Sequence, residues 1–211
     1  MATLQALLAS PDQSVRLKVA LAAGTYPEIE YIDVLVSQCA HEPDFFVRDT
    51  LSWALMRNDI PAVVERLKIE LNSKNPLAKS QAIHTLSKIG NKDNFTLITD
   101  EHLFDADDQV ATTAWRAASV LVPENEKSAL VGKLITQLGR GDSDTQFALT
   151  RFLCAIGDQI VEPLTQAAKS ENETVRTQAE ITLMRSNEMK LEFDKKSNVG
   201  GEGFEPPTFS V

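Results

Sequence analysis

Side chains that could catalyse a reaction or hold a metal are few in this chain and lie far apart. Its three histidines, His41, His84 and His102, form no H-x-x-x-H pair, and neither Cys39 nor Cys154 belongs to a cluster with ligand spacing. Zinc sites depend on such short spacings, because neighbouring ligands must converge on one ion. No Ser, His and Asp order of a nucleophilic hydrolase can be recognised either. The sequence therefore predicts no metal site, no cofactor, no catalytic residue and a function other than catalysis.

Residues of the types that bind other proteins occur at regular intervals. Trp53, His84, Arg116 and Arg151 follow one another at spacings of 31, 32 and 35 residues. Trp and Arg are enriched among the residues that dominate binding energy at protein interfaces. Such spacing places equivalent side chains in a row when successive structural units stack. With three neighbours included, the predicted contact surface for an acidic peptide or a partner helix is Trp53, His84, Arg116, Arg151, Asp49, Phe147 and Met56.

The regular spacing reflects a repeated sequence design. In the segment EPDFFVRDTLSWALMR, Asp44 is followed by Val47, Arg48, Leu51 and Leu55. Five other segments share this pattern, and the gaps between their first Asp or Asn residues are 32, 31, 32, 35 and 30. These first residues are Asp12, Asp44, Asn75, Asp107, Asp142 and Asn172. A nearly fixed period of this length is typical of proteins built from stacked helical repeats.

Each repeat is predicted to contain two helices. The residues three, seven and eleven places after the Asp or Asn are mostly apolar, and these steps keep them on one buried face of a helix. The Asp or Asn oxygen can accept hydrogen bonds from the first free backbone N–H groups, so it should cap this helix. The helix that precedes it in each unit is expected at residues 2–9, 30–41, 60–72, 93–103, 125–139 and 160–170.

The pattern ends near Ser186. The last residues, NVGGEGFEPPTFSV, contain paired glycines and paired prolines and have no helical period. Such a composition cannot bury enough apolar surface to order a segment. We therefore expect a helical repeat domain over residues 1–185 and a disordered C-terminal tail over residues 186–211.

The amino-acid composition limits which kinds of molecule the protein is expected to bind and where in the cell it is expected to be. The net charge of -9 argues against binding nucleic acid through a general electrostatic field, because affinity for phosphates comes from Lys and Arg. No apolar run is long enough to cross a membrane, and the N-terminal segment lacks the basic residues of a secretory signal. The two cysteines, Cys39 and Cys154, are expected to be free thiols of a reducing compartment. The sequence therefore predicts a cytoplasmic protein that contacts neither nucleic acid nor membranes.

The Asp or Asn followed by Val-Arg resembles the HEAT-repeat family, in particular the short bacterial HEAT-like units of phycobilisome lyases. The matching segments are SPDQSVRLKVALAAG, EPDFFVRDTLSWALMR and IVEPLTQAAKSENETVRTQAEITL, and the resemblance covers about residues 1–185. It implies an all-α fold, a right-handed α-solenoid of about six HEAT-like two-helix repeats. In that family the second helix of each repeat lines a concave binding surface. The resemblance thus implies a scaffold or adaptor that binds a protein partner along this surface.

The resemblance also implies a structural ladder of side chains that runs between the repeats. Its expected members are Asp12, Arg16, Asp44, Arg48, Asn172 and Arg176. Ala111 and Gln146 stand where the fourth and fifth units would carry the arginine, so the ladder should be thinner there.

Two other functions stay open. HEAT-like DNA glycosylases use aromatic and acidic side chains on a basic concave face, and Trp53, Asp49, Arg116 and Arg151 partly match that set. A bilin lyase or chromophore chaperone is implied by the family name alone. The acidic balance and the shortage of Lys and Arg argue against the glycosylase. The absence of a recognisable acidic and aromatic pocket argues against the bilin lyase.

Four aromatic residues allow a packing role as well as a binding role. Trp53 could pack between adjacent helices, in which case it would not be free to contact a partner. Trp115 lies at the flank of the apolar face and is expected to be buried. Phe45 and Phe46 could form an exposed contact patch or cover a helix junction, and the sequence does not separate these two arrangements.

Overall fold

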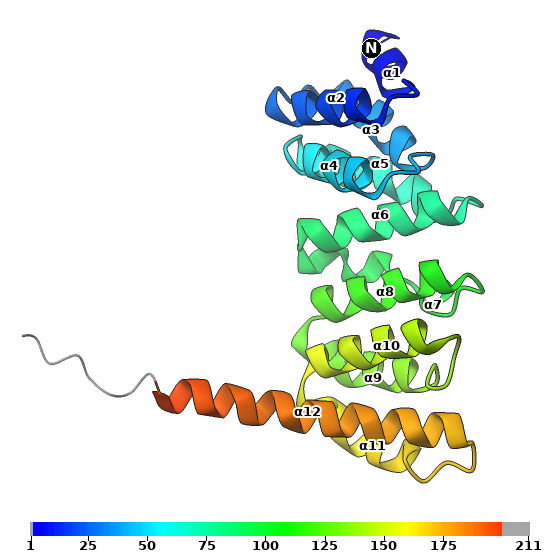
Figure 1. The fold of residues 1–211 in the computed structure, drawn as a ribbon, viewed down its shortest axis with the longest axis vertical. Coiled ribbons are helices and arrows are strands. Elements are labelled where there is room, and N and C mark those ends of the chain that lie inside the picture. Colours follow the sequence, from blue (N-terminus) through cyan, green and yellow to red (C-terminus); the bar gives the residue numbers. More distant parts are fainter. Residues whose placement is uncertain (1, 200–211) are drawn as a thin grey trace, which may run out of the picture.

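The computed structural model of this 211-residue chain describes residues 2–199. Its regular elements are helices and no β-strand occurs within that range, so the predicted all-α class is confirmed. The helices stack one above another in an elongated column, with the N-terminus at one end and α12 at the other (Figure 1). None of the helices in residues 2–199 is both long and apolar enough to cross a lipid bilayer.

One set of helices, which we call the main layer, runs the length of the column. Its members are α2 (Gln13–Thr25), α4 (Phe45–Met56), α6 (Pro76–Ile89), α8 (Asp108–Leu121), α10 (Ser143–Ile156) and α12 (Glu173–Val199). Each of these helices packs on the next one in this order. Small polar side chains bridge some of the contacts, as where the Thr150 and Thr182 hydroxyls lie 3.0 Å apart. The main layer is therefore held together by contacts between immediate neighbours.

The main-layer helices begin where the sequence predicts, because an Asp or Asn caps each one. The Asp44 carboxylate accepts a hydrogen bond from the backbone N–H of Val47 at 3.0 Å, and Asp142 accepts one from Thr145 at 2.9 Å. The same contact is made by Asp12, Asn75, Asp107 and Asn172. Caps of this kind satisfy N–H groups that have no partner inside the helix, which stabilises each by about 1 kcal/mol. All six predicted caps are confirmed.

The remaining helices are shorter and form a second layer that packs against the main layer. They are α1 (Ala2–Leu8), α3 (Tyr31–Cys39), α5 (Ile60–Leu71), η1 (Lys92–Leu97), α7 (Asp100–Leu103), η2 (Glu124–Glu126), α9 (Lys127–Ile135), η3 (Asp158–Ile160) and α11 (Val161–Ala167). The labels η mark short 3₁₀-helices. Most of these elements match the expected first helices of the units within a few residues.

The apolar core lies between the two layers and uses the predicted positions. In the central units Val47, Leu51, Leu55 and Leu86 are fully buried. At the two ends of the column, Val15, Val19, Val175 and Leu183 are half-buried, whereas the smaller Ala23 and Ala179 are buried. Trp115 is also fully buried, as predicted, and its indole N–H donates to the Leu103 carbonyl at 2.8 Å.

The helix expected at residues 93–103 is wrong, because the chain forms η1 and then α7 instead. The break falls at Ile98, whose backbone is extended. His102 causes the restart, since its Nδ1 accepts a hydrogen bond from the Thr99 N–H at 3.1 Å and so caps α7. Its Nε2 lies 3.0 Å from the Leu71 carbonyl, which fixes the ring against α5. The apolar period alone predicts one continuous helix, but the hydrogen bond from the Thr99 N–H to His102 starts a new helix within that stretch.

The boundary near Ser186 also needs correction, because α12 continues to Val199. The residues between them include Met189, Leu191 and several Glu and Lys, all good helix formers, with no Gly or Pro. Helix propensity therefore extends the helix after its apolar face has ended. The remainder of the predicted tail, residues 200–211, lies outside the described residues.

Candidate functional site

Three successive main-layer helices bring together Asp49, His84 and Arg116 around one open groove. These residues come from α4, α6 and α8 respectively. His84 and Arg116 each stand nine places after the capping residue of their helix, and Asp49 stands five places after its own. The groove has a volume of about 150 Å³. We call it the α4–α8 groove, and its lining residues are Phe45, Arg48, Asp49, Gln81, His84, Gln109, Thr113 and Arg116.

The charged groups of this groove are unequally neutralised. The Lys88 ammonium contacts the Asp49 carboxylate, and the His84 Nε2 lies 3.9 Å from the same carboxylate. Arg116 is exposed, and within residues 2–199 no carboxylate lies within ion-pair distance of it. Because Asp49 is already neutralised by Lys88, the remaining charge of the groove is positive and comes from Arg116 and Arg48.

The positive charge around the groove also appears in the acid–base behaviour of His84. Burial lowers the pKa of His84, and the nearby charges of Arg116 and Lys88 lower it further, to about 4. Asp49 acts in the opposite direction and is outweighed. His84 is therefore neutral at pH 7 and can serve as a hydrogen-bonding group.

An NMR titration should show the His84 ring protonating with a midpoint of about 4. The unfolded chain takes up this proton near pH 6.5, so His84 lowers stability progressively as the pH falls from 6.5 to about 4. Urea unfolding at several pH values should show that His84→Gln removes this component. A midpoint near 6.5 in the folded protein would mean that the ring is not surrounded as described.

Arg48 is held at the edge of the same groove. One of its terminal nitrogens donates to the carbonyls of Glu42 at 2.7 Å and Pro43 at 2.8 Å. Its Nε is buried and has no hydrogen-bond partner within the described chain. Arg48 thus stabilises the loop before α4 and still has an unused donor.

Trp53 does not join this groove. Its indole ring packs against α2 at Gly24, so closely that a Cβ atom added at Gly24 would lie 2.6 Å from the ring carbon Cε3. The ring is half-buried and belongs to the core contacts. Trp53, which the sequence suggested as a contact residue, therefore packs between α4 and α2.

The other predicted contact residues are dispersed. Met56 is half-buried on α4, and Arg151 is exposed on α10, and neither lines the α4–α8 groove. Phe147 lines a different hollow of about 530 Å³ between α10 and α12. There the Arg185 guanidinium lies 4.8 Å from the centre of the Phe147 ring. Arg185 stands thirteen places after Asn172. This is not one of the repeated positions considered in the sequence analysis, so Arg185 was missed there.

The residues expected to form a ladder have two separate roles. Asp12, Asp44 and Asn172 cap their own helices, as described above. Arg176, like Arg48, donates to a carbonyl of the preceding loop, that of Ser170, at 2.8 Å. Within the described residues no ion pair joins Asp12 to Arg16 or Asp44 to Arg48.

Two of the ion pairs that join neighbouring units use acidic residues that the sequence pattern missed. Arg16 forms a two-pronged contact with Glu42, at 2.8 Å and 2.7 Å, and Lys79 contacts Asp105 at 2.7 Å. Glu42 and Asp105 each stand two places before a capping residue, and this shared offset is the signal that could have identified them.

Polar contacts continue where the sequence suggested that the ladder would thin. Arg140 comes from the following unit, and its Nε donates to the Asp108 carboxylate at 2.8 Å. Its guanidinium also lies 5.7 Å from the centre of the Trp115 ring. One unit further, Gln178 donates to the Gln146 carbonyl at 2.8 Å. Residues other than the expected ladder arginines therefore join the fourth unit to the fifth and the fifth unit to the sixth.

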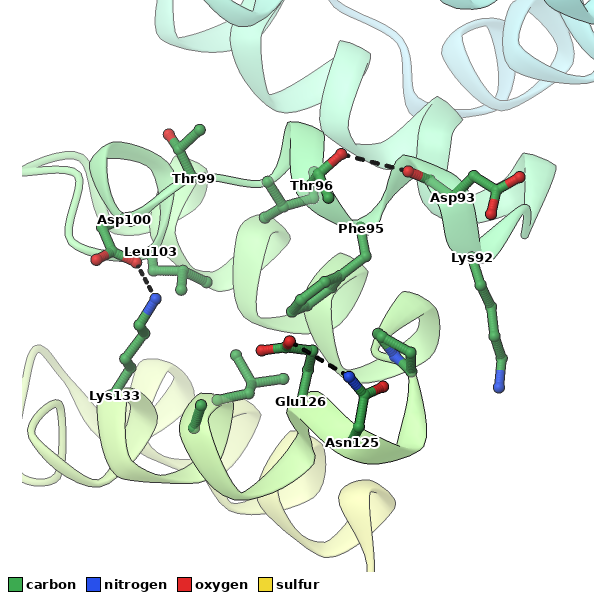
Figure 2. A pocket seen from close by; sticks show the side chains of 14 residues that line it. Lys92, Asp93, Phe95, Thr96, Thr99, Asp100, Leu103, Asn125, Glu126 and Lys133 are labelled. Carbon is green, nitrogen blue, oxygen red and sulfur yellow. Dashed lines mark hydrogen bonds and ion pairs between the residues drawn. The ribbon is translucent and has the colours of Figure 1, made fainter.

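A separate hollow lies in the second layer, where the chain breaks between η1 and α7. It has a volume of about 620 Å³. Figure 2 shows Phe95 pointing into it, with Asn125 and Glu126 on the opposite wall. The ammonium of Lys133 and the carboxylate of Asp100 at its rim pair with each other at 2.6 Å. The hollow contains none of the predicted contact residues.

Comparisons with known proteins give little on function. No family model matches the chain, and no curated protein matches it. A crystal structure of an engineered protein is similar, with a TM-score of 0.47 and 22% identity, over 88% of this chain and 96% of the engineered one. In residues 2–199, no three His, Cys, Asp or Glu side chains gather in a way that could hold a metal ion.

Proposed function

We propose that this protein is a non-catalytic scaffold or adaptor that binds a protein partner along the surface of its main layer. In this proposal the chain is a right-handed solenoid of about six HEAT-like repeats, and the main layer forms its concave side. Support comes from the six equivalent helix caps and from the neighbour-to-neighbour packing of the main-layer helices. The two free cysteines are consistent with a cytoplasmic location, which forms part of the proposal.

The observation that carries the proposal is the α4–α8 groove. Asp49, His84 and Arg116 come from three successive helices, and their side chains meet at an open surface. Arg116 is exposed and has no ion-pair partner in the described chain, so its charge is available to another molecule. The same contacts disfavour the DNA glycosylase alternative, because Asp49 is neutralised by Lys88 and Trp53 packs against Gly24.

Photocrosslinking in the native cytosol tests this function. A photoreactive phenylalanine at position 46, beside the groove, should give one discrete higher-mass adduct, because Phe46 is 68% exposed. The same probe at Tyr26, which is 74% exposed and does not line the groove, is the matched control. Arg116→Ala should remove the adduct formed at position 46. Equal crosslinking from both positions, or none from position 46, would contradict the proposal.

A further inference from the structure

We propose that the α4–α8 groove recognises an acidic side chain of the partner, whose carboxylate binds at Arg116 while a neighbouring apolar residue covers the Phe45–Phe46 pair. This inference rests on the proposed function and specifies the chemistry of the partner. The bound segment would be a peptide in which Asp or Glu stands beside an apolar residue.

The distribution of charge over the two layers supports an acidic ligand. The helices α2, α4, α6, α8 and α10 carry seven Lys or Arg and three Asp residues, a net charge of +4. The second-layer elements carry ten Asp or Glu and five Lys or Arg residues, a net charge of −5. The four Asp caps of these helices, Asp12, Asp44, Asp107 and Asp142, offset that charge, so the main layer is about neutral whereas the second layer is acidic. An acidic segment is therefore repelled by the second layer and not by the main layer.

The interior of the groove offers hydrogen-bond donors to a carboxylate. Arg116 supplies a planar guanidinium that can bind both carboxylate oxygens, which is the strongest geometry for this pair. Gln81 and Gln109 line the same space and carry further donors in their side-chain amides. A volume of about 150 Å³ has room for roughly five water molecules at about 30 Å³ each, or for one acidic side chain in their place.

The rim of the groove explains why an apolar neighbour is expected. Phe45 and Phe46 are 63% and 68% exposed, and their rings meet edge to face at 5.7 Å. Two adjacent aromatic rings left in water at the N-terminus of α4 are unusual unless another molecule covers them. Because Phe45 also lines the groove, one short peptide can reach the rings and Arg116 together.

A nucleic acid fits these features less well. Phosphate recognition along a strand needs a run of cations, and the basic groups of this layer are interrupted. Arg151 lies outside the groove, while Lys88 and Lys79 already contact Asp49 and Asp105. The groove holds only the guanidinium groups of Arg116 and Arg48, and Arg48 is partly engaged by the carbonyls of Glu42 and Pro43, so the groove suits one carboxylate better than a series of phosphates.

Fluorescence anisotropy with a defined peptide tests the inference. The probe is a labelled octapeptide, Gly-Glu-Leu-Glu-Glu-Leu-Glu-Gly, with its all-glutamine counterpart and a single-stranded DNA octamer as comparisons. The full chain should bind the glutamate peptide, and Arg116→Gln should weaken binding by about tenfold. Arg151→Gln is the matched control, because it removes the same charge from an exposed main-layer position outside the groove. It should change affinity by less than about threefold, since a charge outside the contact acts only through the screened long-range field.

Side-chain NMR locates the bound peptide on the protein. The Nε–Hε signals of Arg48 and Arg116 should shift on addition of the glutamate peptide, while that of Arg151 should not. Equal weakening by the two arginine variants, or binding of the DNA but not the peptide, would overturn the inference. If position 46 crosslinks a partner but the glutamate peptide does not bind, the proposed function stands and the carboxylate assignment fails. If the peptide binds at Arg116 but no partner crosslinks, the chemistry of the groove stands and the proposed function fails.

Discussion

Replacing Glu42 by alanine should lower the free energy of unfolding by about 3 kcal/mol, because it leaves a buried arginine without its partner. The Glu42 side chain is fully buried and accepts hydrogen bonds from Arg16, from Gln38 at 3.0 Å and from the Asp44 N–H at 3.1 Å. It thus joins α2, α3 and the cap of α4. Arg16 would keep only its contacts to the carbonyls of Ser10 and Pro11.

Urea unfolding monitored by circular dichroism measures this loss, and Glu65→Ala provides the control. Glu65 pairs with Lys68 at 2.5 Å on the surface of α5, and both side chains are exposed. Its removal deletes the same charge and should cost less than about 0.5 kcal/mol. Similar losses for the two variants would mean that Glu42 does not link the first two units.

The effect of Glu42→Ala should also depend on pH. Burial alone would raise the pKa of Glu42, but the hydrogen bonds from Arg16, Asp44 and Gln38 outweigh burial and lower it below its ordinary value of 4.5. The pair therefore stabilises the fold fully above pH 4.5, and this stabilisation is lost as the pH falls through the lower pKa of the folded state. The difference between the wild type and Glu42→Ala should shrink below pH 4.5.

Replacing Gly24 by alanine should lower the free energy of unfolding by about 2 kcal/mol, although alanine is the better helix former. The new methyl group would lie 2.6 Å from Cε3 and 2.9 Å from Cη2 of the Trp53 ring. These separations are far below van der Waals contact, so the indole or α2 must move. The gain of up to about 1 kcal/mol from helix propensity is smaller than the cost of that displacement.

Gly132→Ala is the matched control for this substitution. Gly132 also lies within a helix, α9, but a Cβ added there meets no atom within 4 Å. That variant should gain about 0.5–1 kcal/mol. In a Trp53→Ala background, Gly24→Ala should lose its penalty, and a double-mutant cycle measures the coupling. If Gly24→Ala alone stabilised the protein, the Trp53 ring would be free of α2 and available to a partner.

The sequence predicted the parts of this fold that depend on local chemistry. The caps follow from Asp and Asn oxygens beside free N–H groups, and the core positions follow from the helical period. Burial of Trp115 was also predicted, from its place at the flank of the apolar face. Such features are set within about a dozen residues, and no knowledge of neighbouring units is needed to identify them.

Features that depend on a neighbouring unit were not predictable from the same pattern. Trp53 occupies a regular position in its own helix, and only Gly24 of the preceding helix provides the space into which its ring packs. Arg140 contacts Asp108 and the Trp115 ring of the preceding unit, where the pattern showed only a missing arginine. The candidate site was therefore predicted in part: Asp49, His84 and Arg116 meet, whereas Arg151 and Phe147 lie elsewhere.

The neighbour-to-neighbour packing of the main layer has a consequence for how the molecule opens. No side-chain hydrogen bond in the described chain joins residues more than 39 positions apart, so the loss of one end removes few contacts from the middle. Opening should then proceed inward from the termini as partial steps, and amide hydrogen exchange should be slowest in the central helices. The α4–α8 groove is built from those central helices. It would keep its shape while the ends of the column fray, and a partner could remain bound to a partly opened chain.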